Sequence, residues 1–223
     1  MATEAPAPAA PGAPITARDG GCMDDTRWIV FVIGSSASGK TVTAKYLAGV
    51  LNAKYIEGDD FHPKANIEKM SRGEPLTDAD RAGWLQAISE HAVVHLRGPG
   101  THHLIVTCSA LKREYRQLLR KGAHEAGDLR LLFVLLDVPE AELIRRSEAR
   151  AGHFAKSNLV RSQLAILERP DSTKEHAEPD VIVVDGNRPL SEVEQSALAI
   201  VETAWHKADE EEKLAAAKKA ATQ

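Results

Sequence analysis

The 223-residue sequence is poor in cysteine, because it contains only Cys22 and Cys108. Cys22 belongs to a polar leader, whereas Cys108 ends an apolar run. A scaffold held together by disulfides is therefore not expected, and the composition favours a reducing compartment. We predict a cytoplasmic protein.

Long apolar runs and a strong net charge are also missing. No stretch reaches the roughly 20 apolar residues of a membrane-spanning helix, and the first residues lack the charged start and apolar core of a secretory signal. The formal net charge is −4, so the chain lacks the global basic field of a nucleic-acid-binding protein, although a local patch stays open. We expect neither a membrane nor a nucleic-acid partner.

The sequence does contain enough apolar residues, 43% of the total, for one domain with a substantial core. Residues 1–25 are rich in Ala, Pro and Gly, and we predict a disordered leader there. The folded domain is predicted to span residues 26–206. Residues 207–223 have a helix-forming composition with little apolar stripe, which predicts a polar helix or a frayed tail.

Short β-rich runs alternate with longer helical patterns, and the five runs lie at residues 28–33, 54–57, 103–108, 131–136 and 181–184. Four of them are almost continuously apolar, as expected for strands covered on both faces. This alternation predicts an α/β domain with a parallel sheet. Two helix starts are also predicted: Thr77 with Asp80 caps one helix, and Ser191 with Glu194 forms a capping box for the last.

The strongest motif follows the first predicted strand and precedes a helix. It matches G-x-x-x-x-G-K-[ST] and consists of Gly34, Ser35, Ser36, Ala37, Ser38, Gly39, Lys40 and Thr41. Backbone N–H groups of such a loop surround phosphate oxygens, and the next helix adds the positive end of its dipole. We expect Lys40 to reach the β- and γ-phosphates of a nucleoside triphosphate and Thr41 to ligate Mg²⁺. The alternative is a Gly/Ser-rich turn with a chance lysine.

Acidic residues follow the second predicted strand. The third strand ends without an aspartate, so Mg²⁺ needs a carboxylate from elsewhere. Glu57, Asp59 and Asp60 stand at the sheet edge where open α/β sheets bind ligands. In an extended segment Glu57 and Asp59 share one side and Asp60 faces away. Asp59 is our candidate for orienting and deprotonating an acceptor hydroxyl, and Glu57 for a water-bridged role at Mg²⁺. Each could also be a solvated turn residue.

The run "EGDDFHPKANIEKMSRGEPLTDADRAGWL" resembles the gluconokinase family, and the similarity continues in "CSALKREYRQLLR" and "EARAGHF". The resemblance implies phosphorylation of D-gluconate at its 6-hydroxyl, with ATP and Mg²⁺ as cofactors. It also implies a P-loop kinase three-layer sandwich of the shikimate-kinase-like type. That fold has a five-stranded parallel sheet of order 2-3-1-4-5 and a helical lid, and such kinases are commonly homodimers.

Gluconate is a linear polyol ending in a carboxylate, so its site needs cations at one end and hydrogen-bonding groups along the chain. The candidates for binding it are Asp59, His62, Asn66, Lys69, Arg81, Ser109 and Lys112. Arg81 and Lys112 are the candidates for its carboxylate. Plainer roles stay open: Arg81 could pair with Asp78 or Asp80 on its own helix. Lys69 could belong to a solvated face.

A lid is predicted for residues 145–170. Arg146, Arg150 and His153 are spaced four and three apart, so a helix would align them on one face. The resemblance favours Arg150 as a catalytic lid arginine and Arg146 as its neighbour at the nucleotide, while His153 shapes the lid or contacts substrate. A solvated basic face is the alternative interpretation of this spacing. Asn187 lies where related small kinases hold adenine, but it could equally form a turn.

One position departs from the family pattern, because Glu57 stands where the family often has Asp. Two rival functions stay open. The chain could be a related kinase acting on another small acid or polyol, such as shikimate, or a catalytically idle nucleotide-binding sensor of a sugar acid. The intact Lys40, Thr41, Asp59 and Arg150 argue against the sensor.

Overall fold

The computed structural model of the chain describes residues 26–98, 102–127, 129–149, 155–170 and 177–220. Its centre is a sheet of five strands, β1 (Arg27–Ile33), β2 (Lys54–Ile56), β3 (His103–Cys108), β4 (Leu129–Asp137) and β5 (Val181–Asp185). The order across the sheet is β2-β3-β1-β4-β5, and every neighbouring pair is parallel. The predicted fold class and the predicted strand order are confirmed.

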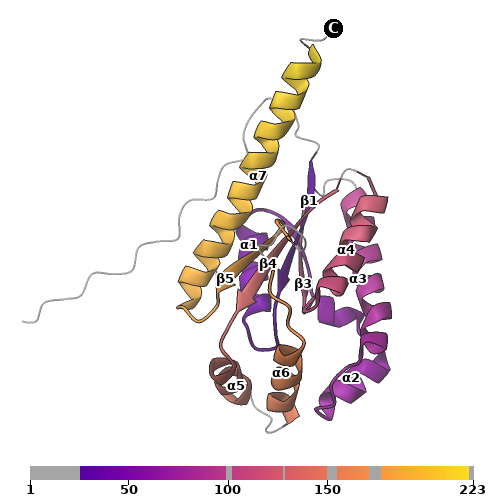
Figure 1. Cartoon of the computed structure of the whole chain (residues 1–223), viewed down its shortest axis with the longest axis vertical. Helices are drawn as coiled ribbons and strands as arrows, with labels where there is room; N and C mark the ends of the chain where they lie inside the picture. The colour runs from indigo at the N-terminus through magenta and orange to yellow at the C-terminus, as the bar shows by residue number, and fades with distance from the viewer. Residues whose placement is uncertain (1–25, 99–101, 128, 150–154, 171–176, 221–223) are drawn as a thin grey trace, which may run out of the picture.

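Helices cover both faces of this sheet and make a three-layer sandwich (Figure 1). One face is covered by α1 (Lys40–Val50) and α7 (Leu190–Ala220), and the other by α3 (Asp78–Arg97) and α4 (Arg113–Glu125). Three shorter helices, α2 (Lys64–Ser71), α5 (Glu140–Ala149) and α6 (Ala155–Ala165), lie together at one end of the molecule (Figure 1).

The core is divided by the sheet because successive residues of a strand point to opposite faces. Phe31 and Ile33 of β1 pack on the α3 and α4 side, whereas Val30 and Val32 pack on the α1 and α7 side. Phe31 stacks on Phe133 of β4, with ring centroids 5.2 Å apart. Burial of each such side chain stabilises the fold by roughly 1.5–3 kcal/mol, so the central strand anchors both layers.

The strand order also brings separate segments to one edge of the sheet. β3 lies between β2 and β1, with Ile56 opposite Val106 and Ile33 opposite Cys108. The loops that leave the carboxyl ends of these three strands are therefore neighbours. They contain the predicted phosphate loop, the acidic residues and Ser109.

The second predicted strand ends earlier than expected. β2 stops at Ile56, and a 3₁₀ helix, η1 (Gly58–Phe61), follows it. The prediction that Glu57 and Asp59 share one side of an extended segment is therefore wrong. The cause is a tertiary contact: a Cβ at Gly58 would lie 2.0 Å from the Thr107 carbonyl oxygen, so only glycine fits where the chain turns.

The two predicted helix starts have different outcomes. Thr77 and Asp80 form the capping box of α3, because Thr77 accepts from the Asp80 backbone and the Asp80 carboxylate accepts from the Thr77 backbone. The predicted Ser191–Glu194 box is wrong. α7 already includes Leu190, and its first carbonyl acceptor is Pro189, which bonds Glu192 N at 2.9 Å.

α7 runs without a break into the predicted tail and ends at Ala220; its last turns extend beyond the sheet (Figure 1). Arg130 of β4 pairs with Glu211 at 3.4 Å and with Glu212 at 3.2 Å. Glu212 also accepts from the Thr26 hydroxyl at 2.5 Å. The boundary at residue 206 stays a prediction, and the predicted leader lies outside the described residues. Across the described ranges, no helix has the length and apolar character needed to cross a membrane.

Candidate active site

The phosphate loop, residues 34–41, joins β1 to α1 as predicted. Gly34 has φ 140°, and a Cβ there would lie 2.8 Å from the Leu136 carbonyl oxygen. Gly39 has φ 102° and stands directly before α1. Glycine adopts these left-handed angles without steric penalty. The Gly34 N–H group donates to Ser109 O at 3.2 Å, so the loop is tied to the end of β3.

Polar atoms of this loop suit an anion. Lys40 Nζ donates to Ser35 O at 2.9 Å, and the Ser36 N–H group donates to Oε1 of Gln163, from α6, at 2.7 Å. The Ser35 and Ser38 hydroxyls are buried and have no hydrogen-bond partner in the described part of the chain. Because buried polar groups are normally hydrogen-bonded, these hydroxyls fit the oxygens of a bound phosphate.

Glu57 lies directly beside the phosphate loop. Its Oε2 accepts from Thr41 Oγ1 at 2.9 Å and from the Tyr55 hydroxyl at 2.6 Å, and its Oε1 accepts from the Thr107 hydroxyl. Burial raises the pKa of Glu57, but the three hydrogen bonds outweigh burial and hold this pKa below its usual value. The carboxylate is therefore ionised at neutral pH, next to the hydroxyl predicted to ligate Mg²⁺.

Thr41 and Glu57 fit a magnesium ion that takes most of its ligands from water and from the nucleotide phosphates. Among the described residues, no group of three or more His, Cys, Asp or Glu side chains could hold a metal ion. Mg²⁺ commonly binds through one or two protein oxygens, with phosphates and waters completing its shell. One hydroxyl and one nearby carboxylate, from Thr41 and Glu57, match that requirement.

Asp59 and Asp60 lie in η1 rather than in an extended segment. The Asp59 side chain is 73% exposed, so a small molecule can reach its carboxylate. Its backbone oxygen accepts from His62 N at 3.2 Å, and Asp60 N donates to Glu57 O at 3.2 Å. The turn thus presents Asp59 at the carboxyl edge of the sheet, two residues after the Glu57 that accepts from Thr41.

Several candidate substrate-binding residues that follow η1 in the sequence are buried. His62, Asn66 and Arg81 are all buried, and Asn66 donates to Asp80 O at 2.8 Å. Lys69 pairs with the Asp80 carboxylate at 2.8 Å, so it is not a merely solvated lysine. These contacts bind α2 to the start of α3.

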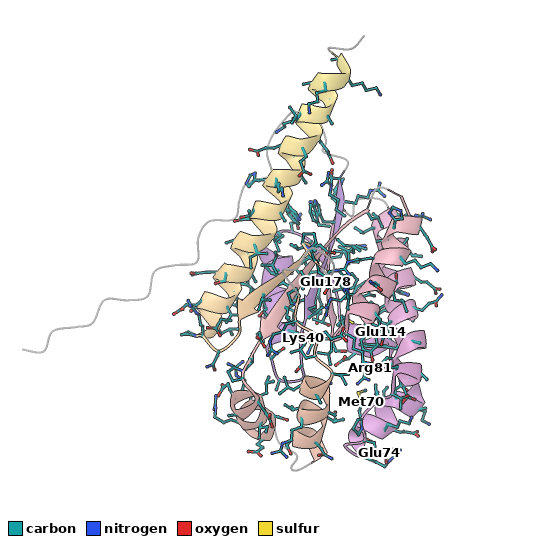
Figure 2. All side chains as sticks on the ribbon, in the orientation of Figure 1. Lys40, Met70, Glu74, Arg81, Glu114 and Glu178 are labelled. Carbon is teal, nitrogen blue, oxygen red and sulfur yellow. The ribbon has the colours of Figure 1, made fainter. Side chains whose placement is uncertain are left out.

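Arg81 does not pair with either acid of its own helix. Its guanidinium donates to Leu76 O at 2.5 Å and lies 5.8 Å from the Tyr115 ring centroid. Within the described ranges, no ion pair joins Arg81 to Asp78 or Asp80, so that alternative is wrong. The buried arginine therefore has guanidinium capacity left for an anion. Figure 2 shows it on the α3 side of the molecule, with Lys40 nearer the centre.

Lys112, the second candidate for a carboxylate, already has acidic partners. Its ammonium group lies 2.8 Å from Asp78 and 3.3 Å from Glu114, and the Tyr115 hydroxyl also donates to Asp78. A substrate carboxylate at Lys112 would have to replace Asp78. Ser109 is half-buried and contacts the phosphate loop through its backbone oxygen.

The predicted lid, residues 145–170, covers the end of α5 and all of α6, but Arg150 and His153 lie outside the described residues. Arg146 donates to Glu142 at 2.6 Å and to Gly186 O at 3.0 Å. It therefore reaches the turn after β5 in which Asn187 N donates to Asp185 at 3.0 Å. That turn lies next to an open cleft of about 420 Å³ lined by Asp137, Pro139, Arg169, Val183 and Asp185.

Several contacts, at the site and elsewhere in the fold, were not predicted. Tyr55 is two positions before Glu57, so strand periodicity could have paired them. Gln163 carries no motif that indicates a contact with the phosphate loop. The ion pair of the buried Arg116 with Glu178 joins residues 62 positions apart and has no local sequence signal.

A further hollow of about 490 Å³ lies between α4 and β4, and none of its lining residues belongs to this site.

The chain is similar to several known proteins. The family model described as an AAA domain matches residues 29–170. A probable gluconokinase of Schizosaccharomyces pombe is 43% identical over 176 residues, covering 78% of this chain and 88% of that protein. The gluconokinase of Gluconobacter oxydans is 47% identical over 139 residues, covering 62% of this chain and 74% of that protein. The crystal structure of a gluconokinase from Sinorhizobium meliloti is 37% identical, with a TM-score of 0.66 over 82% of this chain and 97% of that one.

Proposed function

Because the chain belongs to the gluconokinase family, we propose that it transfers the γ-phosphoryl group of ATP to the 6-hydroxyl of D-gluconate. The products are 6-phospho-D-gluconate and ADP. The observation that carries this proposal is the 43% identity to a relative of that family over 88% of the relative's length. The Ser35 and Ser38 hydroxyls, which are buried and have no hydrogen-bond partner among the described residues, support phosphate binding by the loop of residues 34–41.

The nucleotide end of the reaction is assigned to the phosphate loop. Lys40 exchanges Ser35 O for the β- and γ-phosphate oxygens, and the backbone N–H groups bind the remaining oxygens. Mg²⁺, when bound with ATP, would neutralise phosphate charge and orient the γ-phosphoryl group. Thr41 would hold it directly and Glu57 through water, and the ionised state of Glu57 supports that role.

The acceptor end is assigned to Asp59. Its carboxylate takes the proton of the 6-hydroxyl while that oxygen bonds to phosphorus and the bond from phosphorus to the ADP oxygen breaks. The exposure of Asp59, two residues after the Glu57 that accepts from Thr41, supports this assignment. Arg150 would neutralise charge on the transferring group and help the lid to exclude water.

The remaining assignments concern binding. Arg81 and Lys112 would meet the gluconate carboxylate, and Lys112 would exchange Asp78 for it. The other candidates for gluconate are His62, Asn66, Lys69, Ser109 and His153. Arg146 and Asn187 would lie at the nucleotide, and the contact of Arg146 with the neighbouring Gly186 supports their common location. A homodimer and a cytoplasmic location complete the proposal.

ADP release tests this function directly. The protein is given MgATP with D-gluconate, its epimers, glucose, shikimate or glycerate, beside an Asp59→Asn variant shown to fold and to bind ATP. We expect turnover with gluconate that falls about 100-fold or more in the variant, as for loss of a general base. Turnover on another panel member alone would identify a different small-molecule kinase. ATP binding without turnover on any member would favour the sensor.

A further inference from the structure

The Trp84 indole contacts both the turn that contains Asp59 and the imidazole ring of His62. We propose that His62 is a positioning residue, a neutral imidazole whose Nε2–H group orients the Asp59 carboxylate toward the acceptor hydroxyl. This inference rests on the proposed function, in which Asp59 receives the proton. It replaces direct contact with substrate as the role of His62.

Trp84 fixes the two groups relative to each other. The His62 ring stacks on the Trp84 ring, with centroids 4.1 Å apart and an interplanar angle of 13°. The Trp84 Nε1–H group donates to Gly58 O at 2.7 Å, immediately before Asp59. Trp84 is itself 1% exposed, so the packed core sets the position of both the turn and the imidazole.

Asn66 determines which imidazole nitrogen carries the proton. Asn66 Nδ2 donates to Asp80 O at 2.8 Å, which fixes the orientation of the amide because a carbonyl oxygen only accepts. The same Nδ2 lies 3.4 Å from His62 Nδ1. An amide nitrogen cannot accept, so Nδ1 must be the acceptor and the proton of the neutral ring must lie on Nε2.

The protonated nitrogen lies near the Asp59 carboxylate. His62 Nε2 lies 3.9 Å from Asp59 Oδ1, which is longer than a hydrogen bond. The exposed Asp59 side chain can close that distance by rotation, and catalytic hydrogen bonds are often long before substrate binds. A bond to Oδ1 would leave Oδ2 for the acceptor hydroxyl, so the carboxylate would be presented in one orientation.

The surroundings of His62 favour its neutral form. Burial lowers the pKa of His62, the charge of Asp59 opposes that shift, and Arg81 adds to it. The imidazole is therefore a neutral donor near pH 7. Such a donor orients a carboxylate through a hydrogen bond, without the full charge of an imidazolium.

Two substitutions separate the proposed role from packing. His62→Phe keeps a ring on Trp84 but removes the donor, and His62→Gln offers an N–H donor of similar reach. We expect kcat of His62→Phe to fall about 10- to 100-fold, with both KM values changed less than about twofold, and His62→Gln to recover most of the loss. His124→Phe, at an exposed position of α4, is the control and should match the unaltered protein.

The same substitution in an Asp59→Asn background makes the test specific. Residues that act as one unit are not additive, so His62→Phe should lower kcat little further when Asp59 is already replaced. An equal fall in both backgrounds would overturn the inference. So would a higher KM for gluconate at unchanged kcat, because that result assigns His62 to direct substrate binding.

A substrate-free measurement keeps the inference separate from the proposed function. In ¹⁵N NMR spectra of histidine-labelled protein at pH 7, we expect His62 with its proton on Nε2 and a shifted Nε2–H resonance in Asp59→Asn. A proton on Nδ1, or a charged ring, would overturn the inference. If the unaltered protein releases no ADP with gluconate, the proposed function fails, and the spectra still decide the state of His62.

Discussion

Thr41 Oγ1 donates a 2.9 Å hydrogen bond to Glu57 Oε2 and so joins the first turn of α1 to the residue that follows β2. Tyr55 and Thr107 donate to the same carboxylate from β2 and β3. Three hydroxyl groups from three elements therefore hold one ionised side chain beside the phosphate loop. The proposed metal role of Glu57 can therefore be tested with a substitution that removes the charge of the side chain and keeps its shape.

Glu57→Gln keeps the size of the side chain and removes its charge. We expect the Mg²⁺ concentration for half-maximal ADP release to rise about tenfold. Loss of a residue that hydrogen-bonds to the ligands of a metal, without binding the metal itself, typically has an effect of this size. Mg²⁺ titration at saturating ATP measures this. Glu57→Asp is the matched control, because it retains the charge and should cause a smaller rise. The same Mg²⁺ dependence in all three proteins would contradict the metal role.

Two glycine substitutions compare a crowded position with an open one. A Cβ at Gly58 would lie 2.0 Å from Thr107 O, whereas a Cβ at Gly49 in α1 meets nothing within 4 Å. Gly58→Ala should lower the free energy of unfolding by about 2–3 kcal/mol through the clash and should lower activity by moving the turn that carries Asp59. Gly49→Ala should raise that free energy by about 0.5–1 kcal/mol.

Urea denaturation of both glycine variants, with ADP release measured in parallel, checks this pair. A stable and fully active Gly58→Ala protein would show that the turn tolerates the displacement. The contact with Thr107 would then not explain why the strand ends at Ile56.

Gln163→Ala removes the side-chain acceptor of the Ser36 N–H group. A nucleotide phosphate would then no longer displace a hydrogen bond, and we expect the Kd for MgADP to fall about fivefold, the equivalent of one net hydrogen bond. Isothermal titration calorimetry measures the Kd. Ser162→Ala is the control, because that hydroxyl bonds Leu159 O inside α6. Weaker binding by Gln163→Ala would instead mean that the amide contacts the nucleotide.

Glu178→Gln should destabilise the protein strongly. Glu178 accepts from Arg116 at 3.0 Å and from Arg120 at 2.9 Å, and Arg116 is 0% exposed. Removal of its partner leaves a buried guanidinium without a counter-charge, which costs about 3 kcal/mol or more. Urea denaturation at pH 7 measures the loss. A change under about 0.5 kcal/mol, the range of surface substitutions, would contradict it.

The hydrogen bonds of Glu178 with Arg116 and Arg120 also predict that the stability of the protein depends on pH. Burial raises the pKa of Glu178, but hydrogen bonds from Arg116 and Arg120 outweigh burial and hold this pKa below its usual value. Since the pKa is lower in the folded state, the carboxylate stabilises the fold above about pH 4.3, the ordinary glutamate value, and that contribution is lost as pH falls through the folded pKa. The stability difference between the unaltered protein and Glu178→Gln should therefore shrink below about pH 4. A constant difference down to pH 3 would contradict this.

Local patterns predicted the parts of the protein that depend on neighbouring residues. Short β-rich runs, four of them almost continuously apolar, identified the five strands of the described sheet. The G-x-x-x-x-G-K-T spacing placed the phosphate loop, and Thr77 with Asp80 formed the expected cap. Contacts between distant segments were not predicted. The turn at Gly58 depends on Thr107, and Lys112 pairs with Asp78, 34 positions away. Residue types alone do not reveal which acid reaches which base.

The contact between Ser36 and Gln163 has a thermodynamic consequence for nucleotide entry. Under the proposed function, the Ser36 N–H group would exchange one oxygen acceptor for another when a phosphate binds, so this bond would contribute little net binding enthalpy. Affinity would then come from new hydrogen bonds, such as those between phosphate oxygens and the Ser35 and Ser38 hydroxyls, which have no partner within the described ranges. In return, the ligand-free protein keeps this N–H group hydrogen-bonded, and nucleotide binding requires less reordering of the backbone at Ser36.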